Sequence, residues 1–417
     1  MAQPLINITQ KHAYTFAFFL VLYEFLTYIA NDMIMPGMIN VVASFHGPES
    51  AIASSLTAYV LGGASLQLFL GPLSDRYGRR PVMIFGAGFF FLCTVLIACS
   101  NSIDQFLAAR FFQGMGLCFI CVIGYATLQE IFAEMDAIRL ISIMANVSIT
   151  APLLGPLLGA VFIHYFSWRI IFVIIAALAL MVLWGLWRVM PEPLGQIKRD
   201  GEKIKVTPLS VRVIAENYKA LLKNRSFMLG SFALGLLCLP CVAWIGLAPV
   251  ILVLDAKLSM IQYGLWQIPV FGAYALGNIC LHRMTHHISI KNMVWIGSII
   301  ATIGLLCMII LPMLTDGNYI WLMPGLIIYF MGSGIAMAPL NRFILFSTEV
   351  SKGTASALIS MITMTIQGLG IEASNFLYLS HSNHIFGFGC AITGVVCIAL
   401  WAGAVYSTDR PHSGSFL

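Results

Sequence analysis

The chain has 417 residues, of which 59% are hydrophobic and only 9% are charged. Soluble domains are about 25% charged, so this composition excludes a soluble globular protein and indicates an integral membrane protein. The formal net charge of +5 comes from basic residues between the apolar segments, and it does not indicate a nucleic-acid-binding surface.

Apolar segments long enough to cross about 30 Å of hydrocarbon recur along the whole chain. We expect twelve membrane-spanning helices, at residues 13–43, 50–71, 81–100, 103–128, 138–163, 167–189, 227–254, 261–281, 292–313, 318–340, 353–379 and 384–406. The first segment is too long for a signal peptide and lacks a small-residue cleavage site, so we expect it to be retained. The pattern predicts an all-α integral membrane fold without a soluble domain.

The positions of Lys and Arg predict the orientation, because cytoplasmic loops retain positive charge. With the N-terminus inside, most of the 22 Lys and Arg residues fall on the inner side. Only Arg169 and Lys257 fall on the other side, and Arg110 falls within a span. We therefore expect a multi-pass protein of the bacterial cytoplasmic (inner) membrane with both termini in the cytoplasm.

One long polar stretch divides the spans into two sets of six. We expect a six-helix bundle at residues 1–190, a cytoplasmic linker at 191–226 and a second six-helix bundle at 227–417. Within the linker, residues 209–222 have an apolar side at helical spacing, which predicts an interfacial helix. Paired six-helix halves around a midplane substrate site are a common transporter architecture.

The first span, "YEFLTYIANDMIMPGM" at residues 23–38, carries polar residues where charge is costly. Glu24 and Asp32 are about 12 Å apart along the helix axis and roughly 80° apart around it, so they cannot share one proton. Glu24, Tyr28 and Asn31 form one polar stripe that is expected to face a cavity. An intramembrane carboxylate is neutralised by a proton or by a cation.

The stretch "GPLSDRYGRRP" at residues 71–81 combines helix breakers with a charge cluster. Its Gly and Pro residues predict a tight turn between the second and third spans. In the fourth span, Arg110 lies at a membrane depth compatible with that of Asp32. We expect these two residues to form a pair that opens and closes as Asp32 gains and loses a proton.

A Gly-Pro stretch and two cysteine pairs can be interpreted as structural features of the helices. "APLLGPLLG" at residues 151–159 contains prolines and glycines that kink a helix and let its neighbour approach closely. The pairs "CFIC" at 118–121 and "CLPC" at 238–241 have the spacing of redox or zinc sites, but they lie in apolar spans without a nearby second pair. We expect these cysteines to pack as small hydrophobic residues.

The stretch at residues 71–81 resembles the signature loop of the major facilitator superfamily. "RFFQG" at 110–114 resembles that family's membrane-embedded arginine motif, and residues 151–159 resemble the Gly-Pro motif of its drug:proton exporters. This resemblance implies the twelve-helix fold of the family in two six-helix halves. It also implies a charge latch between Asp75 and Arg76 that stabilises one access state. The predicted conformational residues are Asp75, Arg76, Arg79, Arg80, Gly155 and Pro156.

Nearly the whole chain resembles the MdfA-type multidrug/proton antiporters within that superfamily. The matching stretches are "LVLYEFLTYIANDMIMPGM", "GYATLQE", "IMANV", "PCVAWI" and "VSKGT". The resemblance implies that Glu24 and Asp32 serve drug recognition and proton binding. We predict proton coupling at Glu24, Asp32 and Arg110. The predicted substrate-binding residues are Glu24, Tyr28, Asn31, Met35, Tyr125, Met144, Pro240 and Trp244. Cys238 and Cys241, which depart from the family pattern in the seventh span, leave the substrate range open.

These features predict proton-coupled export of lipophilic cationic and neutral drugs, such as quaternary cations and chloramphenicol-like compounds. We expect a monomer without enzymatic activity or a bound cofactor, in which the proton is the coupling ion. The first alternative is a dedicated exporter of an endogenous metabolite, such as a siderophore-like organic acid, for which Arg110 is the available cation. A proton-coupled nutrient importer and a membrane enzyme or receptor-like scaffold are further alternatives.

Overall fold

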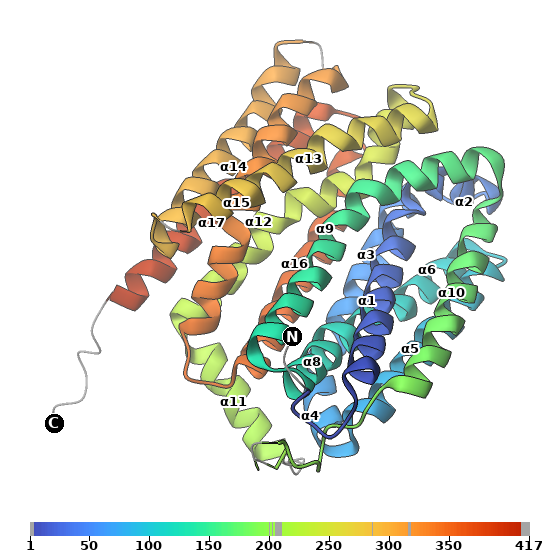
Figure 1. Cartoon of the computed structure of the whole chain (residues 1–417). Coiled ribbons are helices and arrows are strands. Elements are labelled where there is room, and N and C mark those ends of the chain that lie inside the picture. The colour runs from blue at the N-terminus through green and yellow to red at the C-terminus, as the bar shows by residue number, and fades with distance from the viewer. Residues whose placement is uncertain are drawn as a thin grey trace. The chain divides into compact units, whose positions relative to one another are not determined.

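The computed structural model describes residues 4–199, 201, 203–204, 211–285, 287–315 and 318–409. These residues form helices joined by short connections (Figure 1). Within the described ranges, the only β-type pairing is an isolated bridge between Ile197 and Lys203. The predicted all-α fold is confirmed.

Internal contacts divide the chain into two compact units. The first unit comprises Met1–Ala51 and Ala58–Ile214, and the second comprises Ile52–Thr57 and Ala215–Leu417. This division does not separate a linker, so the expected linker limits at residues 191 and 226 stay a prediction.

The first half of the chain folds around a bundle of long helices. Its elements are α1 (Gln10–Asp32), η1 (Met35–Gly37), α2 (Met38–Ser44), α3 (Ala51–Ser65), α4 (Gln67–Tyr77), α5 (Arg79–Ala98), α6 (Ile103–Gly114), α7 (Gly116–Phe119), η2 (Ile120–Gly124), α8 (Tyr125–Ile131), α9 (Glu134–Tyr165) and α10 (Trp168–Val189). Helix α1 packs against α9 and α10, and α5 packs against α6 and α10 (Figure 1). The first predicted span is therefore a central helix of its unit.

The second half contains the remaining helices. They are α11 (Val211–Lys223), α12 (Arg225–Pro249), η3 (Val250–Asp255), α13 (Met260–Met284), α14 (Ile290–Met313), η4 (Tyr319–Trp321), α15 (Leu322–Phe346), α16 (Lys352–Tyr378) and α17 (Asn383–Asp409). Helix α12 packs against α15, α16 and α17. Helix α11 overlaps the predicted interfacial helix, although residues 209–210 lie outside the described residues and its place at a membrane surface stays a prediction.

Helical structure covers each of the twelve predicted ranges. Among the described residues, nine helical segments are long and apolar enough to cross a membrane, or ten if α3 and α4, which are bent by 43°, form one span. In α9, the described residues include an apolar stretch at Thr150–Tyr165, which is shorter than a full span. The multi-pass architecture is thus present, and the count of twelve stays a prediction.

The sequence at the helix starts explains several of these boundaries. Ser102 accepts a hydrogen bond from the backbone N–H of Gln105 at the start of α6. Ser259 and Gln262 form a reciprocal capping box at the start of α13. Such side chains satisfy backbone N–H groups that have no partner within the helix, so they favour a helix start at that position.

The turn expected within residues 71–81 is confined to Gly78, and Gly71 and Pro72 do not break the helix. Both residues lie inside α4, and the chain breaks instead at Gly78, where φ is +111°. A proline inside a membrane helix removes one backbone hydrogen bond, which neighbouring groups can replace. The backbone at Gly78 has a conformation that favours glycine, so the break falls there. The charged stretch is therefore the end of one helix and the start of the next.

Glycines set the distance between α3 and α6. A Cβ atom on Gly62 would collide with the carbonyl group of Phe111, and one on Gly114 would collide with that of Tyr59. Small residues at such contacts let helix backbones approach closely in membranes. This contact places Tyr59 beside Arg110, the predicted proton-coupling residue of the fourth span.

Candidate functional site

Glu24 lies in α1 with no exposed surface. The hydroxyl of Tyr125, at the start of α8, donates a hydrogen bond of 2.8 Å to its Oε1. Tyr125 follows the five-residue π-helical turn η2 at Ile120–Gly124. Such turns change which side chains face a neighbouring helix and often occur at functional sites. The structure thus brings together two of the predicted substrate residues.

Arg110 is also fully buried, and it bonds to neutral polar groups. Its Nη2 donates to Oδ1 of Asn31 at 2.6 Å, and its Nη1 donates to Oε1 of Gln113 at 2.7 Å. The Nδ2 of Asn31 in turn donates to Oδ1 of Asp32 at 3.1 Å. The predicted partners Arg110 and Asp32 are therefore connected through the side chain of Asn31.

Residues of α3 and α1 also lie around Arg110. The ring of Tyr59 from α3 lies 4.6 Å from the Arg110 guanidinium carbon. The Tyr59 hydroxyl donates to the carbonyl of Thr27 in α1 at 2.5 Å. An aromatic face attracts a cation, and burial strengthens this attraction. Tyr59 therefore helps to hold the arginine against α1.

Sequence analysis did not single out Tyr59, Gln113 or Thr94. The Nε2 of Gln113 donates to the hydroxyl of Thr94 in α5 at 2.9 Å, which extends the network to another helix. Gln113 stands three residues after Arg110, at a spacing that places both side chains on one helix side. That spacing is the signal that could have identified it.

Helix α9 approaches α1 directly beside Asp32. A Cβ atom on Gly155 would lie 2.6 Å from the Cβ of Asp32, and one on Gly159 would collide with the carbonyl of Met33. Pro152 and Pro156 also lie inside this helix. The predicted conformational residue Gly155 thus stands at a close contact between α9 and α1, beside Asp32.

Of the other predicted substrate residues, Tyr28 is half-buried in α1, and the rest lie at separate places. Met35 is buried in η1, and Met144 is buried in α9. Pro240 and Trp244 belong to α12 of the second unit, where the Trp244 Nε1 donates to Oε1 of Gln267 at 2.9 Å. Both residues are buried.

The charge cluster between α4 and α5 centres on Arg79. Its Nη1 lies 2.7 Å from Oδ1 of Asp75, and its Nη2 lies 2.8 Å from Oε1 of Glu130 in α8. Arg76, the expected partner of Asp75, is exposed and lies over the ring of Tyr77. The structure therefore differs from the expected latch, because Asp75 pairs with the second arginine of the stretch.

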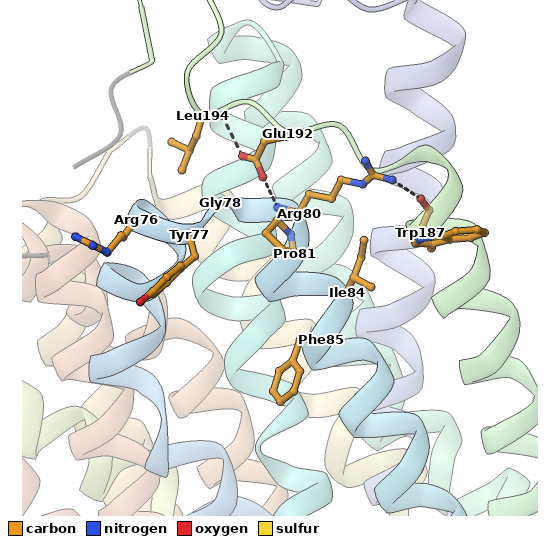
Figure 2. A pocket seen from close by; sticks show the side chains of 10 residues that line it. All are labelled: Arg76, Tyr77, Gly78, Arg80, Pro81, Ile84, Phe85, Trp187, Glu192 and Leu194. Carbon is orange, nitrogen blue, oxygen red and sulfur yellow. Dashed lines mark hydrogen bonds between the residues drawn. The ribbon is translucent and has the colours of Figure 1, made fainter. Parts of the chain in front are cut away.

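Glu192, which sequence analysis also did not select, caps α5 from outside the helix. Its Oε1 accepts the backbone N–H of Arg79 at 3.1 Å, and its Oε2 accepts that of Arg80 at 2.9 Å (Figure 2). A carboxylate is favourable at a helix N-terminus, where backbone N–H groups point outward. Gly78 has no side chain to make this cap itself, so Glu192 ties the chain after α10 to the start of α5.

Comparison with known proteins agrees with this architecture. The family model for the Major Facilitator Superfamily matches residues 20–371. The proton symporter for D-xylose aligns with a TM-score of 0.75 at 16% identity, covering 93% of this chain and 97% of that one. The Escherichia coli xylose transporter XylE, in a partially occluded inward-open conformation, aligns with a TM-score of 0.71 at 17% identity over 98% and 100%. These solved structures share the fold.

Relatives found by sequence comparison share a much higher sequence identity with this chain than these solved structures do. "Multidrug transporter MdfA" of Yersinia pestis bv. Antiqua (strain Angola) is 45% identical over 395 residues, or 95% of this chain and 94% of that protein. The protein of the same name from Escherichia coli O6:H1 is 43% identical over 405 residues, or 97% and 96%. The fold, with its buried acids and arginine, defines a multi-pass membrane transporter. The chain belongs to the major facilitator superfamily, as its sequence motifs predict.

Proposed function

We propose that the protein exports lipophilic cationic and neutral drugs from the cytoplasm in exchange for protons, by alternating access. The relatives named multidrug transporter MdfA support the substrate class. The observation that carries the proposal is the fully buried carboxylate of Glu24, bonded to Tyr125. A buried carboxylate is stable only when a proton or a cation neutralises it, and a drug cation can replace the proton.

Asp32 has a different role in this proposal. Its carboxylate shares the amide of Asn31 with Arg110, so a change of charge at Asp32 alters the energy of the whole network. The close contact of Asp32 with Gly155 transmits that change to α9. Proton uptake and release at Asp32 thereby shift the balance between the two access states.

The bonding of Arg110 argues against the organic-acid exporter. An anionic substrate needs a cation that can turn toward it, but Arg110 already donates to Asn31, Gln113 and the carbonyl of Ala30. Its guanidinium also lies over the Tyr59 ring. The arginine thus serves the internal network, which favours drug export over export of an anion.

The proposal also covers the membrane location, the oligomeric state and the coupling ion of the transporter. The protein lies in the bacterial inner membrane with both termini in the cytoplasm, which agrees with the distribution of Lys and Arg. It works as a monomer, since one chain supplies both acids and the arginine. The proton is the coupling ion, and no bound cofactor takes part.

A resistance assay tests the substrate class. The protein is expressed in a pump-deficient bacterial strain, which is then challenged with chloramphenicol, ethidium and a quaternary ammonium compound. Resistance to these chemically unlike compounds is the expected result. Resistance to none of them, with correct insertion of the protein in the membrane, contradicts drug export and favours the metabolite exporter.

Glu24→Gln tests the proposed substrate acid. We expect loss of ethidium and quaternary ammonium export with chloramphenicol export retained, because the amide keeps the shape but cannot neutralise a cation. Asp104→Asn, at an exposed acid at the start of α6, is the matched control and should export all three compounds normally. Equal loss of neutral and cationic export in Glu24→Gln would contradict this role.

A further inference from the structure

A pocket of about 800 Å³ opens in the first unit where α4 leads into α5 (Figure 2). Arg76 lies on one side of it, and Arg80 and Trp187 lie on the other. Glu192 stands between them at the Gly78 break. The pocket lies outside the buried Glu24 and Arg110 sites, and the proposed transport mechanism does not use it.

The two arginines of this pocket, Arg76 and Arg80, have N–H donors that form no hydrogen bond among the described residues. In the described part of the chain, neither Arg76 nor Arg80 forms an ion pair with a carboxylate. Arg80 donates from Nη2 to the carbonyl of Trp187, and Arg76 lies over the ring of Tyr77. A guanidinium carries five N–H donors in a planar fork that matches phosphate oxygens. Both arginines can therefore donate further hydrogen bonds.

The one acid of the pocket, Glu192, offsets one of the two arginine charges and leaves one net positive charge. The Glu192 carboxylate accepts backbone N–H groups of Arg79, Arg80 and Leu194. Its oxygens are thus directed to the helix end and the linker backbone. An anion in the pocket would meet the two arginine side chains, with the Glu192 oxygens already bonded elsewhere.

The rest of the wall is apolar and open. Tyr77, Phe85 and Trp187 expose 65%, 66% and 53% of their surfaces, and Ile84 lies one position before Phe85 on α5. Phe85 lies deeper along α5 than Arg80 (Figure 2). Aromatic rings at the end of membrane helices contact both headgroups and acyl chains. The wall therefore combines anion donors at one end with an apolar surface below them.

We propose that this pocket binds an anionic phospholipid, with its phosphate at Arg76 and Arg80 and its acyl chain along Ile84, Phe85 and Trp187. A soluble phosphate ester has the same phosphate group, but it has no acyl chain that could contact the exposed aromatic wall. Basic residues next to membrane helices attract anionic lipids by about 1 kcal/mol each, or about fivefold in affinity. The site adjoins the Arg79 cluster, so bound lipid stabilises the α4–α5 connection.

Fluorescence quenching of Trp187 tests this proposal on the full-length protein. The protein is reconstituted with phosphatidylcholine, and phosphatidylglycerol with brominated acyl chains is titrated in. The chain has eight tryptophans, so the signal lost in Trp187→Phe isolates the contribution of Trp187. We expect quenching at Trp187 to saturate at a lower mole fraction of brominated phosphatidylglycerol than of brominated phosphatidylcholine.

Variants separate the charge effect from general contact with lipid. Arg76→Gln and Arg80→Gln should each weaken the preference for phosphatidylglycerol by about fivefold. Arg188→Gln is the matched control, since it removes a charge beside Trp187 from a residue that does not line the pocket. Arg76 is exposed, so its variant is expected to fold even if Arg80→Gln does not.

Two results would overturn the lipid site. Equal quenching by the two brominated lipids, or an unchanged preference in Arg76→Gln, shows that the arginine does not select an anionic headgroup. Displacement of brominated phosphatidylglycerol by soluble glycerol phosphate assigns the pocket to a free phosphate ester instead. Drug export is not measured in this experiment, so its outcome does not depend on the proposed function.

Discussion

Two arginines of the first unit are held in opposite ways. Arg79 lies between the carboxylates of Asp75 and Glu130, with bonds of 2.7 and 2.8 Å. Arg110 is more deeply buried, yet it donates to the amide oxygens of Asn31 and Gln113. Two fixed carboxylates neutralise Arg79 permanently and make it a structural clamp. Neutral partners at Arg110 leave its charge to be balanced through Asn31 by Asp32, whose charge can change.

Removal of Arg110 is expected to have the largest effect. Arg110→Met leaves the amide oxygens of Asn31 and Gln113 without their donor in a buried site, and each acceptor left in this way costs about 1 to 3 kcal/mol. We expect a large fall in the unfolding temperature in detergent, together with loss of all drug export. Wild-type stability in Arg110→Met would show that the network contributes little to folding.

Removal of Arg79 should have a smaller effect that does not depend on the drug. Arg79→Gln breaks charge-assisted bonds to Asp75 and Glu130, each worth about 1.5 to 3 kcal/mol, although solvent at this partly exposed cluster reduces the loss. Export of cationic and neutral drugs should fall by the same factor. The exposed Arg188 at the end of α10, changed to Gln, is the control and should change the stability by less than about 0.5 kcal/mol. Selective loss of cation export in Arg79→Gln would contradict a clamp.

The smallest effect on stability is expected at the amide between Arg110 and Asp32. Asn31→Ala removes hydrogen bonds worth about 0.5 to 1.5 kcal/mol each, while Arg110 keeps its bonds to Gln113 and Ala30. We expect the protein to fold and to bind drug, with fewer protons released per drug bound. Asn40→Ala, at an exposed residue of α2, is the matched control. Normal proton release in Asn31→Ala would show that the amide does not connect the two charges.

The sequence alone was sufficient for the fold class, and it also singled out the charged members of the candidate site. Glu24, Asp32 and Arg110 stand out because charge inside an apolar span is costly. Tyr59 and Thr94 were missed because aromatic and hydroxyl residues are common in such spans and carry no charge. The neutral residues of a buried network can be recognised only when the helix contacts that bring them together are known.

The charge cluster between α4 and α5 shows a second limit of prediction from sequence. Gly71 and Pro72 predict a turn, but α4 continues to Tyr77 and the break falls at Gly78. Asp75 and Arg79 lie on opposite sides of that break, so helical spacing does not predict their contact. Glu192 is more than 110 positions further along the chain from Gly78. Local patterns do not predict so distant a partner.

The central claim is that Asp32 exchanges a proton while Arg110 remains its network partner. Its most direct test is the release of protons by detergent-purified protein in weakly buffered solution when a drug is added, compared between wild type and Asp32→Asn. We expect the wild type to acidify the solution, and Asp32→Asn to release clearly fewer protons while it still binds the drug. Proton release by Asp32→Asn equal to that of the wild type would contradict the account.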